Sequence, residues 1–385
     1  MRNVAVIGVG QTKFGELWRY SLRDLIAEAG LAALRDANVE KPCIDALYVG
    51  NMSAGTFAGQ EHVGALAADS LGLRVPAVRC EAACASGGVA FRQAYHALGA
   101  GVYDVALVIG VEKMTELSTP AAVSSLALAG DHEWEASIGL TFAGLYALIA
   151  RAHMQRYGTT HEQLAHVSVT NHKNAVGNLY AQFQNEITVE DVLNATKIAD
   201  PLTIYDCSPI TDGAAAVVLA SGPVVQRISK PIWVLGSGQG TDTLALHDRA
   251  SFTEMAATKA AAKRAFSQAG GSIADIDVCE VHDCFSINEV IALEDLGFCK
   301  KGEGGRFVER GEIGLAGSIP TNTTGGLKAC GHPVGATGVR QVIEIARQLR
   351  GDSHNQLKDV QRGLALNIGG SGATAVTTIL GRNEP

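Results

Sequence analysis

Cys84 is the first residue of this 385-residue sequence that has the surroundings of a nucleophile. It lies in EAACASGGVA, residues 81–90, directly before a Ser-Gly-Gly turn and a helical pattern that continues to about Leu98. A helix N-terminus lowers the pKa of a thiol and directs free N–H groups toward nearby negative charge. A buried cysteine packed among small residues is the structural alternative, so this stretch alone leaves both interpretations open.

Three further stretches carry groups that could act together with a thiol. His282 and Cys284 lie in VHDCFSINE, where a buried-strand pattern ends, and His332 lies in the glycine-rich loop CGHPVGATG that opens a helix. The glycines of NIGGSG, residues 367–372, can expose backbone N–H groups to a ligand. A lone histidine at a strand end is more often structural. Neither a GxGxxG fingerprint in its required context nor a GxxxxGK[ST] loop occurs, which argues against a nucleotide-phosphate loop.

The elements that must position these groups occur twice along the chain. Three pairs of stretches match in the same order, and two of them follow the pattern of buried strands ending in glycine. The pairs are residues 43–51 with 275–283, 104–110 with 363–369, and 212–222 with 371–381. Ordered self-similarity of this kind predicts two copies of one α/β unit. The alternative is that buried strands in chains rich in alanine and glycine resemble one another by composition.

The two copies differ in one place. NIGG leads directly into SGATAV in the second copy, whereas about 100 residues separate the corresponding stretches of the first. This insertion has helical periodicity, and it follows a strand end, where open α/β sheets bind their ligands. We predict core halves at 1–114 plus 211–225 and at 231–385, an inserted loop domain at 115–210 that forms part of a binding site, and a join near residues 222–234.

Composition excludes several classes of protein. The net charge is −8 and no long basic run occurs, so nucleic acid is not an expected partner. No stretch reaches the ~18 apolar residues of a membrane helix, and the N-terminus is typical of a first strand rather than a signal peptide. Eight cysteines without CxxC pairs predict a reduced, cytoplasmic chain that holds no metal.

The four motifs together resemble the thiolase superfamily over essentially the whole chain. CASGG matches the nucleophile loop, HDCF the loop after the third strand, GHPVGATG the histidine loop and NIGGSG the last loop. The similarity is greatest to archaeal acetoacetyl-CoA thiolases and to sterol-carrier-protein-type thiolases. It implies an α/β thiolase fold, with a duplicated five-layered α-β-α-β-α core and an inserted, mostly helical loop domain, residues 115–210, that binds CoA.

The chain departs from the usual thiolase pattern at two positions. Most thiolases have Asn-Glu-Ala-Phe in place of His282-Asp283-Cys284-Phe285, and they have a second reactive cysteine where this chain has Asn367. The sterol-carrier type shares the His-Asp-Cys-Phe form, and its motif cysteine takes the acid/base role. The resemblance therefore assigns that role to Cys284, with Cys330 as the rival that departs from the family pattern. The other five cysteines are interpreted as structural.

The resemblance also implies the mechanism. It predicts an acetyl-CoA C-acetyltransferase, in which Cys84 attacks the thioester, His332 takes its proton and Cys284 deprotonates a second acetyl-CoA. The oxyanion donors are expected to be the backbone N–H groups of Cys84 and Gly369, with His282 and His332 at the enolate oxygen. The thioester activates the carbon itself, so no cofactor is expected. Lys173 and Arg151 are candidates for contacts with the anionic CoA.

The expected assemblies and the competing functions also follow from the resemblance. A homodimer or a dimer of dimers is expected, and the archaeal group suggests a complex with hydroxymethylglutaryl-CoA synthase and a zinc-ribbon/OB-fold protein that binds CoA. Such a complex would feed the mevalonate pathway. One alternative is a decarboxylating ketoacyl synthase or another acyl-CoA condensing enzyme or aldolase. A non-catalytic scaffold or lipid-carrier subunit is the alternative from a different class.

Overall fold

The computed structural model describes residues 1–228 and 230–385. Its main feature is a nine-stranded sheet in the order β3-β2-β4-β7-β1-β8-β11-β10-β9. The strands of the N-terminal half are β1 (Val4–Gln11), β2 (Ala46–Gly50), β3 (Ala77–Cys80), β4 (Val105–Glu112) and β7 (Gly213–Ser221). Those of the C-terminal half are β8 (Ile232–Thr241), β9 (Val278–Glu280), β10 (Arg362–Gly369) and β11 (Thr374–Gly381).

The sheet has the symmetry that the internal repeats predict. Each half places its first strand beside its last. The next strand outward is the one that contains Ile-Gly, β4 or β10, and it pairs in parallel with the strand beyond it, β2 or β9. The halves meet where β1 pairs with β8, at Ala5 with Trp233 and at Val6 with Ile232. Because equivalent strands hold equivalent places, the three sequence pairs reflect a duplicated architecture and not composition alone.

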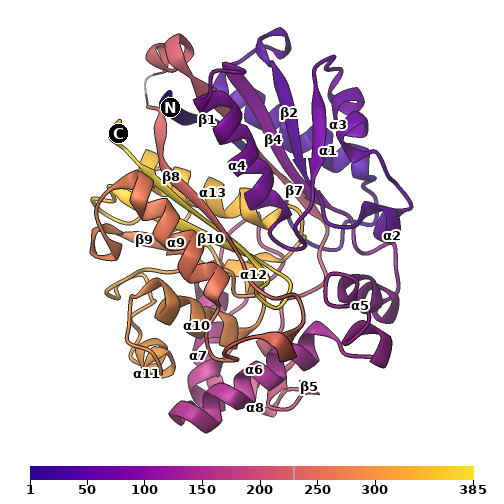
Figure 1. The fold of residues 1–385 in the computed structure, drawn as a ribbon, viewed down its shortest axis with the longest axis vertical. Helices are drawn as coiled ribbons and strands as arrows, with labels where there is room; N and C mark the ends of the chain where they lie inside the picture. The colour runs from indigo at the N-terminus through magenta and orange to yellow at the C-terminus, as the bar shows by residue number, and fades with distance from the viewer. Residues whose placement is uncertain (229) are drawn as a thin grey trace.

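Helices cover the two half-sheets and fill the space between them (Figure 1). α1 (Leu22–Ala37) and α3 (Val63–Leu71) lie on the outer face of the first half, and α9 (Ala256–Ala269) with α10 (Ser286–Leu296) on the outer side of the second. Between the halves, α4 (Ser86–Gly99) packs against α13 (Thr337–Arg350) and both contact strands of each half. The result is the expected α-β-α-β-α sequence of layers.

Apolar burial accounts for this layering. Fully buried Val, Ile and Leu side chains of the strands form one cluster with α4 and α13, a second with α1 and α3, and a third with α9 and α10. Burying such a side chain contributes about 1.5–3 kcal/mol. The two central helices are therefore held on all sides, which fixes the positions of their N-termini.

The segment after β4 is mostly helical, as its periodicity predicts. It contains α5 (Thr119–Ala127), α6 (Phe142–Tyr157), α7 (His161–Ala175), α8 (Val189–Asn194) and the short strands β5 (Lys197–Ala199) and β6 (Leu202–Thr203). In Figure 1, α6, α7 and α8 gather at the lower end of the molecule, beyond the strand ends of both halves. The division of the chain into domains at residues 115, 210 and 231 stays a prediction.

The remaining elements are short. α2 (Ala54–Ala58), α11 (Gly304–Glu309) and α12 (Gly326–Cys330) connect the larger ones. The predicted join at residues 222–234 includes residue 229, which lies outside the described residues, and its last three residues already belong to β8. Among the described residues, no helix has the length and apolar character that crossing a membrane requires.

Candidate active site

Cys84 occupies a strained turn between β3 and α4. The preceding Ala83 adopts a left-handed φ of 53°, a conformation that costs free energy for a residue other than glycine and that is concentrated at functional sites. The Ser86 hydroxyl holds this turn, because it donates to the Ala83 carbonyl at 2.6 Å and accepts from the Ala82 N–H at 2.9 Å. The Cys84 thiol is thereby fixed just before the first turn of α4, with only 8% of the residue exposed.

His332 is held in one tautomer by the loop that precedes α13. The Thr337 hydroxyl donates its single proton to the Pro333 carbonyl at 3.1 Å, so its oxygen accepts from Nδ1–H of His332 at 2.7 Å. The other ring nitrogen, Nε2, then carries a lone pair and has no partner within the described chain. His332 is therefore arranged as a proton acceptor.

His282 follows β9 and has the opposite tautomer. The Asn367 side-chain oxygen accepts from the Gly88 N–H at 3.1 Å, which fixes the orientation of the amide. Its Nδ2 group then donates to the Cys84 carbonyl at 3.0 Å and to Nδ1 of His282 at 3.2 Å. Nε2 of His282 therefore carries the hydrogen, and this imidazole is arranged as a hydrogen-bond donor.

The structure brings these three side chains together. The Cys84 sulfur and one ring nitrogen each of His282 and His332 lie within 4.8 Å of one another, and the imidazole centroids are 5.0 Å apart. A cysteine and two histidines could in principle hold a metal ion. The hydrogen on Nε2 of His282 leaves no lone pair there for a metal, so the arrangement fits thiol chemistry better.

Glycines allow the N-termini of the two central helices to come this close. A Cβ added at Gly87 would lie 2.7 Å from the Gly335 carbonyl oxygen, and one at Gly338 would lie 2.3 Å from the Gly88 nitrogen. Contacts under 3.0 Å to backbone atoms cannot be relieved by rotating a side chain. The glycines of CASGG and GHPVGATG are thus required for the approach of the nucleophile loop to the histidine loop.

Cys284 follows His282 by two residues and lies near enough to Cys84 for the two thiols to interact electrostatically. Its carbonyl accepts from the Ser208 N–H at 2.9 Å, and Asn288 places its amide 3.6 Å from the sulfur. The thiol faces both Cys84 and the phenol of Tyr146. Cys330 has different surroundings, because the charged groups near it are Arg340, Glu344 and Glu280. The structure therefore places Cys284, and not Cys330, beside the nucleophile.

Burial determines the resting charges of the site. It raises the pKa of the Cys84 thiol to about 12, although backbone N–H groups of Gly370 and of Cys84 itself act in the opposite direction. Burial, together with Arg340 and Lys328, lowers the pKa of His332 to about 3. At neutral pH the resting site therefore holds a thiol beside a neutral imidazole, not an ion pair.

The remaining predicted residues are Gly369, Arg151 and Lys173, which lie outside the cluster of Cys84, His282 and His332. Gly369 ends β10 opposite Thr374, and a Cβ on it would lie 2.4 Å from the Ala82 carbonyl oxygen, so its backbone borders the nucleophile turn. The N–H that contacts the thiol is that of the next residue, Gly370. The oxyanion role of Gly369 stays a prediction.

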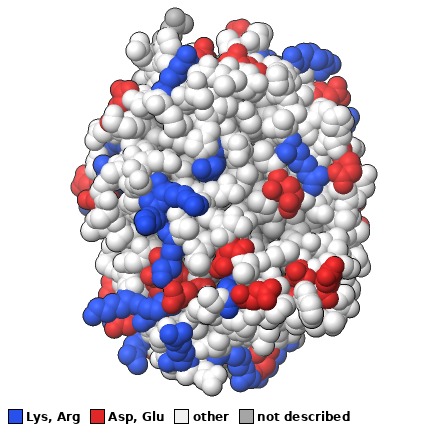
Figure 2. Space-filling view, in the orientation of Figure 1, with Lys and Arg blue, Asp and Glu red and all other residues white. Residues whose placement is uncertain are grey.

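The two basic residues suggested for CoA lie on the inserted helices. Arg151 of α6 forms an ion pair with Asp200, and Lys173 is exposed on α7. On the face shown in Figure 2, basic side chains are more numerous over the lower half, where these helices lie, and acidic side chains are mixed among them. Neither residue contacts the catalytic cluster, and their role in CoA binding stays a prediction.

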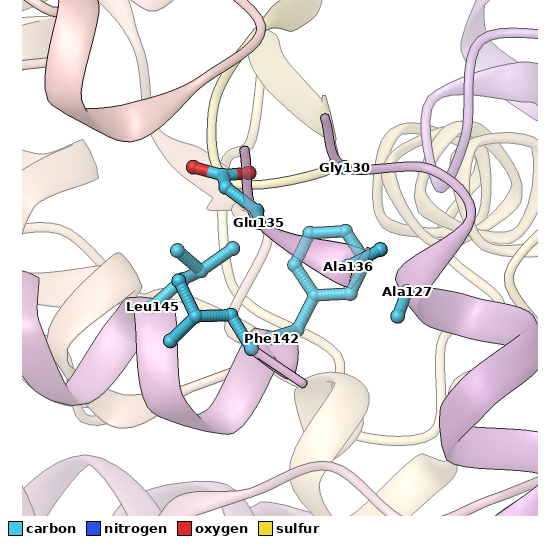
Figure 3. A pocket seen from close by; sticks show the side chains of 7 residues that line it. Ala127, Gly130, Glu135, Ala136, Phe142 and Leu145 are labelled. Atoms are coloured by element: carbon cyan, nitrogen blue, oxygen red, sulfur yellow. The ribbon is translucent and has the colours of Figure 1, made fainter. Parts of the chain in front are cut away.

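A narrow cavity with no room for a water molecule lies within the insertion. Figure 3 shows the ring of Phe142 in this cavity, between Leu145 and Ala127. The same ring is near the position that a Cβ on Gly370 would take, at 3.8 Å. The insertion therefore reaches the loop that contacts the nucleophile.

Three residues of the site were not identified from the sequence as functional: Tyr146, Thr337 and, in its orienting role, Asn367. In the sequence, Asn367 stands where the resemblance leads us to expect a cysteine, and nothing there indicates its orienting role. Its partners Gly88 and Cys84 lie 279 and 283 residues away along the chain, so no local pattern indicates them. Thr337 follows His332 by five residues, and this spacing across a helix start is the one signal that could have suggested it.

Comparison with protein families gives the class of this protein. Residues 4–222 match the family described as Thiolase, N-terminal domain, and residues 238–382 match the Thiolase C-terminal domain-like family. The chain belongs to the thiolase family, and it is an acyltransferase of the thiolase type.

Individual relatives agree with this class. The chain is 53% identical to the acetyl-CoA acetyltransferase of Methanothermobacter thermautotrophicus, over 99% of this chain and 100% of the relative. It is 35% identical to human sterol carrier protein 2, over 98% of this chain and 72% of that protein. Among solved structures, an Ltp2-ChsH2(DUF35) aldolase matches with a TM-score of 0.86 at 28% identity, covering 99% of this chain and 98% of the other.

Proposed function

We propose that this protein is an acetyl-CoA C-acetyltransferase that condenses two molecules of acetyl-CoA to acetoacetyl-CoA and CoA, reversibly, through an acetyl group on Cys84. The observation that carries the proposal is the cluster of Cys84, His332 and His282, in which the two histidines have opposite tautomers. The name of the relative at 53% identity supports the choice of acetyl-CoA as the substrate.

The first half-reaction uses Cys84 and His332. Nε2 of His332 takes the thiol proton as the sulfur attacks the thioester carbonyl, so the charged nucleophile exists only when the substrate is present. Donors for the resulting oxyanion are the N–H groups of Cys84 and of the Gly369–Gly370 turn. Collapse of the tetrahedral intermediate releases the CoA thiolate and leaves acetyl-Cys84.

The second half-reaction requires a base for the methyl group of the next acetyl-CoA. Cys284 protonates the CoA thiolate after its release, and its own thiolate then removes a proton from that methyl group. Nε2–H of His282 faces the same space and supplies a hydrogen bond to the enolate oxygen, with His332 beside it. The enolate attacks acetyl-Cys84, and the released Cys84 thiolate recovers its proton from His332. Protons therefore balance over the cycle without a metal or an organic cofactor.

The chain's inserted helices are proposed to cover the site and to bind CoA, with Arg151 and Lys173 near its phosphates.

We also place the reaction in the cytoplasm, in a homodimer or dimer of dimers that supplies acetoacetyl-CoA to the mevalonate pathway. Condensation of two thioesters to one is unfavourable, so transfer to hydroxymethylglutaryl-CoA synthase within a complex would draw the reaction forward. A structural neighbour is named for two components, Ltp2 and ChsH2(DUF35), and this supports a partner protein for a chain of this fold.

One assay separates this function from its alternatives. A thiolase condenses acetyl-CoA alone and cleaves acetoacetyl-CoA with CoA, whereas a decarboxylating synthase requires malonyl-CoA. A scaffold or lipid carrier turns over neither. A thiol base beside the nucleophile favours the thiolase, because decarboxylation creates the carbanion without a base. Cleavage of longer or aromatic 3-ketoacyl-CoA in preference to acetoacetyl-CoA would indicate another acyl substrate; a relative from Thauera aromatica, 34% identical, is named benzoylsuccinyl-CoA thiolase subunit BbsB.

A further inference from the structure

Tyr146 is a buried tyrosine in the active site that the mechanism above does not use. It belongs to α6 of the insertion, and its side chain is fully excluded from solvent. Its ring stacks on Phe285, with centroids 4.5 Å apart and planes inclined by 22°. Since Phe285 directly follows Cys284, this stack fixes the phenol against the segment that carries the thiol.

The phenol hydroxyl lies between the two cysteines. It donates to the Gly370 carbonyl at 3.1 Å, while the N–H of the same glycine contacts the Cys84 sulfur. The hydroxyl also lies close enough to the Cys284 sulfur for each group to shift the pKa of the other. One glycine residue and one phenol therefore connect the nucleophile to the sulfur that acts as base.

We propose that Tyr146 is a positioning residue for Cys284, whose O–H bonds to the Gly370 carbonyl at rest and turns to the Cys284 sulfur when that sulfur becomes a thiolate. This inference rests on the proposed function, because it needs Cys284 to hold a negative charge between the two half-reactions. No bond to carbon forms or breaks in the switch. The phenol keeps its proton throughout and changes only the acceptor to which it donates.

The chemistry of the site explains why such a donor is needed. Burial raises the pKa of the Cys284 thiol above its ordinary value, and the hydrogen bond from Tyr146 is the largest influence that lowers it. Burial also raises the pKa of the phenol well above 10, so the hydroxyl remains a donor at every pH at which the enzyme is expected to act. A hydrogen bond to a charged group is stronger than one to a neutral carbonyl.

The test compares Tyr146→Phe with Tyr95→Phe as the matched control. Tyr95 is a buried tyrosine of α4 that lies in the core cluster between the half-sheets, away from Cys284. In Tyr146→Phe we expect acetylation of Cys84 within about twofold of wild type and carbon–carbon bond formation reduced by about 10- to 100-fold. Tyr95→Phe should leave both rates unchanged. Equal rates in Tyr146→Phe and wild type would overturn the inference.

A second readout does not depend on turnover. In a Cys84→Ala background, the pH dependence of alkylation at Cys284 is followed by peptide mass spectrometry, with and without Tyr146→Phe. Loss of the donor should move the pH dependence of alkylation to higher pH, because the thiolate is less stabilised, and an unchanged profile would refute the proposal. If wild type fails to condense acetyl-CoA, the proposed function fails, while this readout still reports on Tyr146.

A third preparation covers the case in which Tyr146→Phe does not fold. Fluorinated tyrosine, incorporated at all tyrosines of the Cys84→Ala protein, keeps the ring and makes the phenol a stronger donor. The alkylation profile of Cys284 should then move to lower pH. No movement relative to the unfluorinated protein would count against the switch, and the same fluorination in Cys84→Ala/Tyr95→Phe serves as the control.

Discussion

The two halves of this molecule have one architecture and contribute different chemistry. In the first half, the loop before α4 carries Cys84, the proposed nucleophile, and in the second the loop before α13 carries His332, its proposed base. Equivalent strands hold equivalent places on both sides of the β1–β8 junction. The duplicated strands and helices therefore form the scaffold. The reactive groups lie on loops that differ in sequence between the two halves, at the place where the halves meet.

The connection between the last two strands of each half shows the same division. In the second half β10 passes to β11 through a tight turn that includes Gly370, whereas the long helical insertion lies between β4 and β7 of the first. These two unequal connections meet at the nucleophile, because Tyr146 of the insertion bonds to the Gly370 carbonyl. The second half therefore supplies the turn that includes Gly370, and the insertion of the first half packs over that turn.

Substitution of Cys84, the reactive residue of the first half, should have the largest effect on turnover. Cys84→Ala and Cys84→Ser are expected to abolish both condensation and thiolysis, because the acetyl group then has no thiol to carry it between the two half-reactions. Steady-state assays in both directions measure this loss. Cys43→Ala is the matched control, since Cys43 is exposed and lies in a short turn far along the chain from the site. Measurable turnover in Cys84→Ala would contradict the assignment.

Cys284→Ala should separate the two half-reactions. Acetylation of Cys84 is expected to remain near the wild-type rate, whereas carbon–carbon bond formation should fall by more than the ~10²–10⁴-fold that one acid/base group typically contributes. Rapid-quench labelling measures the first step and product formation the second. Cys330→Ala provides the comparison, and a greater loss in that variant would assign the base to Cys330 instead.

A smaller loss of activity is expected when His332 loses the hydrogen bond that fixes the orientation of its ring. Thr337→Val removes the hydroxyl that accepts from Nδ1–H, so the lone pair of Nε2 is no longer fixed toward Cys84. Acetylation of Cys84 should slow by about 10- to 100-fold. Thr258→Val, at a buried threonine of α9, controls for the loss of a hydroxyl. Equal losses in both variants would show that Thr337 acts only through folding.

The smallest expected signal is the ultraviolet absorbance of the Cys84 thiolate in the enzyme without substrate. Because the pKa of Cys84 is raised to about 12 and that of His332 is lowered to about 3, both groups are neutral between these values. The ultraviolet absorbance of a thiolate should therefore be equal in wild type and Cys84→Ala at neutral pH, and it should rise in wild type only in strong alkali. Excess absorbance that appears with a midpoint near neutrality would indicate a resting ion pair.

Short motifs predicted the reactive groups, the internal repeats predicted two copies of one α/β unit, and the resemblance to thiolases implied the five layers. Cys84, His282 and His332 each follow a pattern of strand or loop and lie at a junction with a helix, and the structure brings them together. The orienting contacts could not be predicted in this way. The hydrogen bonds of Asn367 to Gly88 and Cys84, and that of Tyr146 to Gly370, join segments more than 200 residues apart. Only the folded chain shows which polar groups satisfy one another.

The central claim is that the halves assemble a site in which Cys84 carries the acetyl group and His332 takes its proton. Mass spectrometry of wild type, quenched in acid after brief incubation with acetyl-CoA, tests it most directly. The account predicts one added acetyl group per chain, mapped to the peptide that contains Cys84 and absent from Cys84→Ala, with its formation slowed in His332→Ala. An acetyl group on Cys284 or Cys330 in wild type, or one retained in Cys84→Ala, would contradict it.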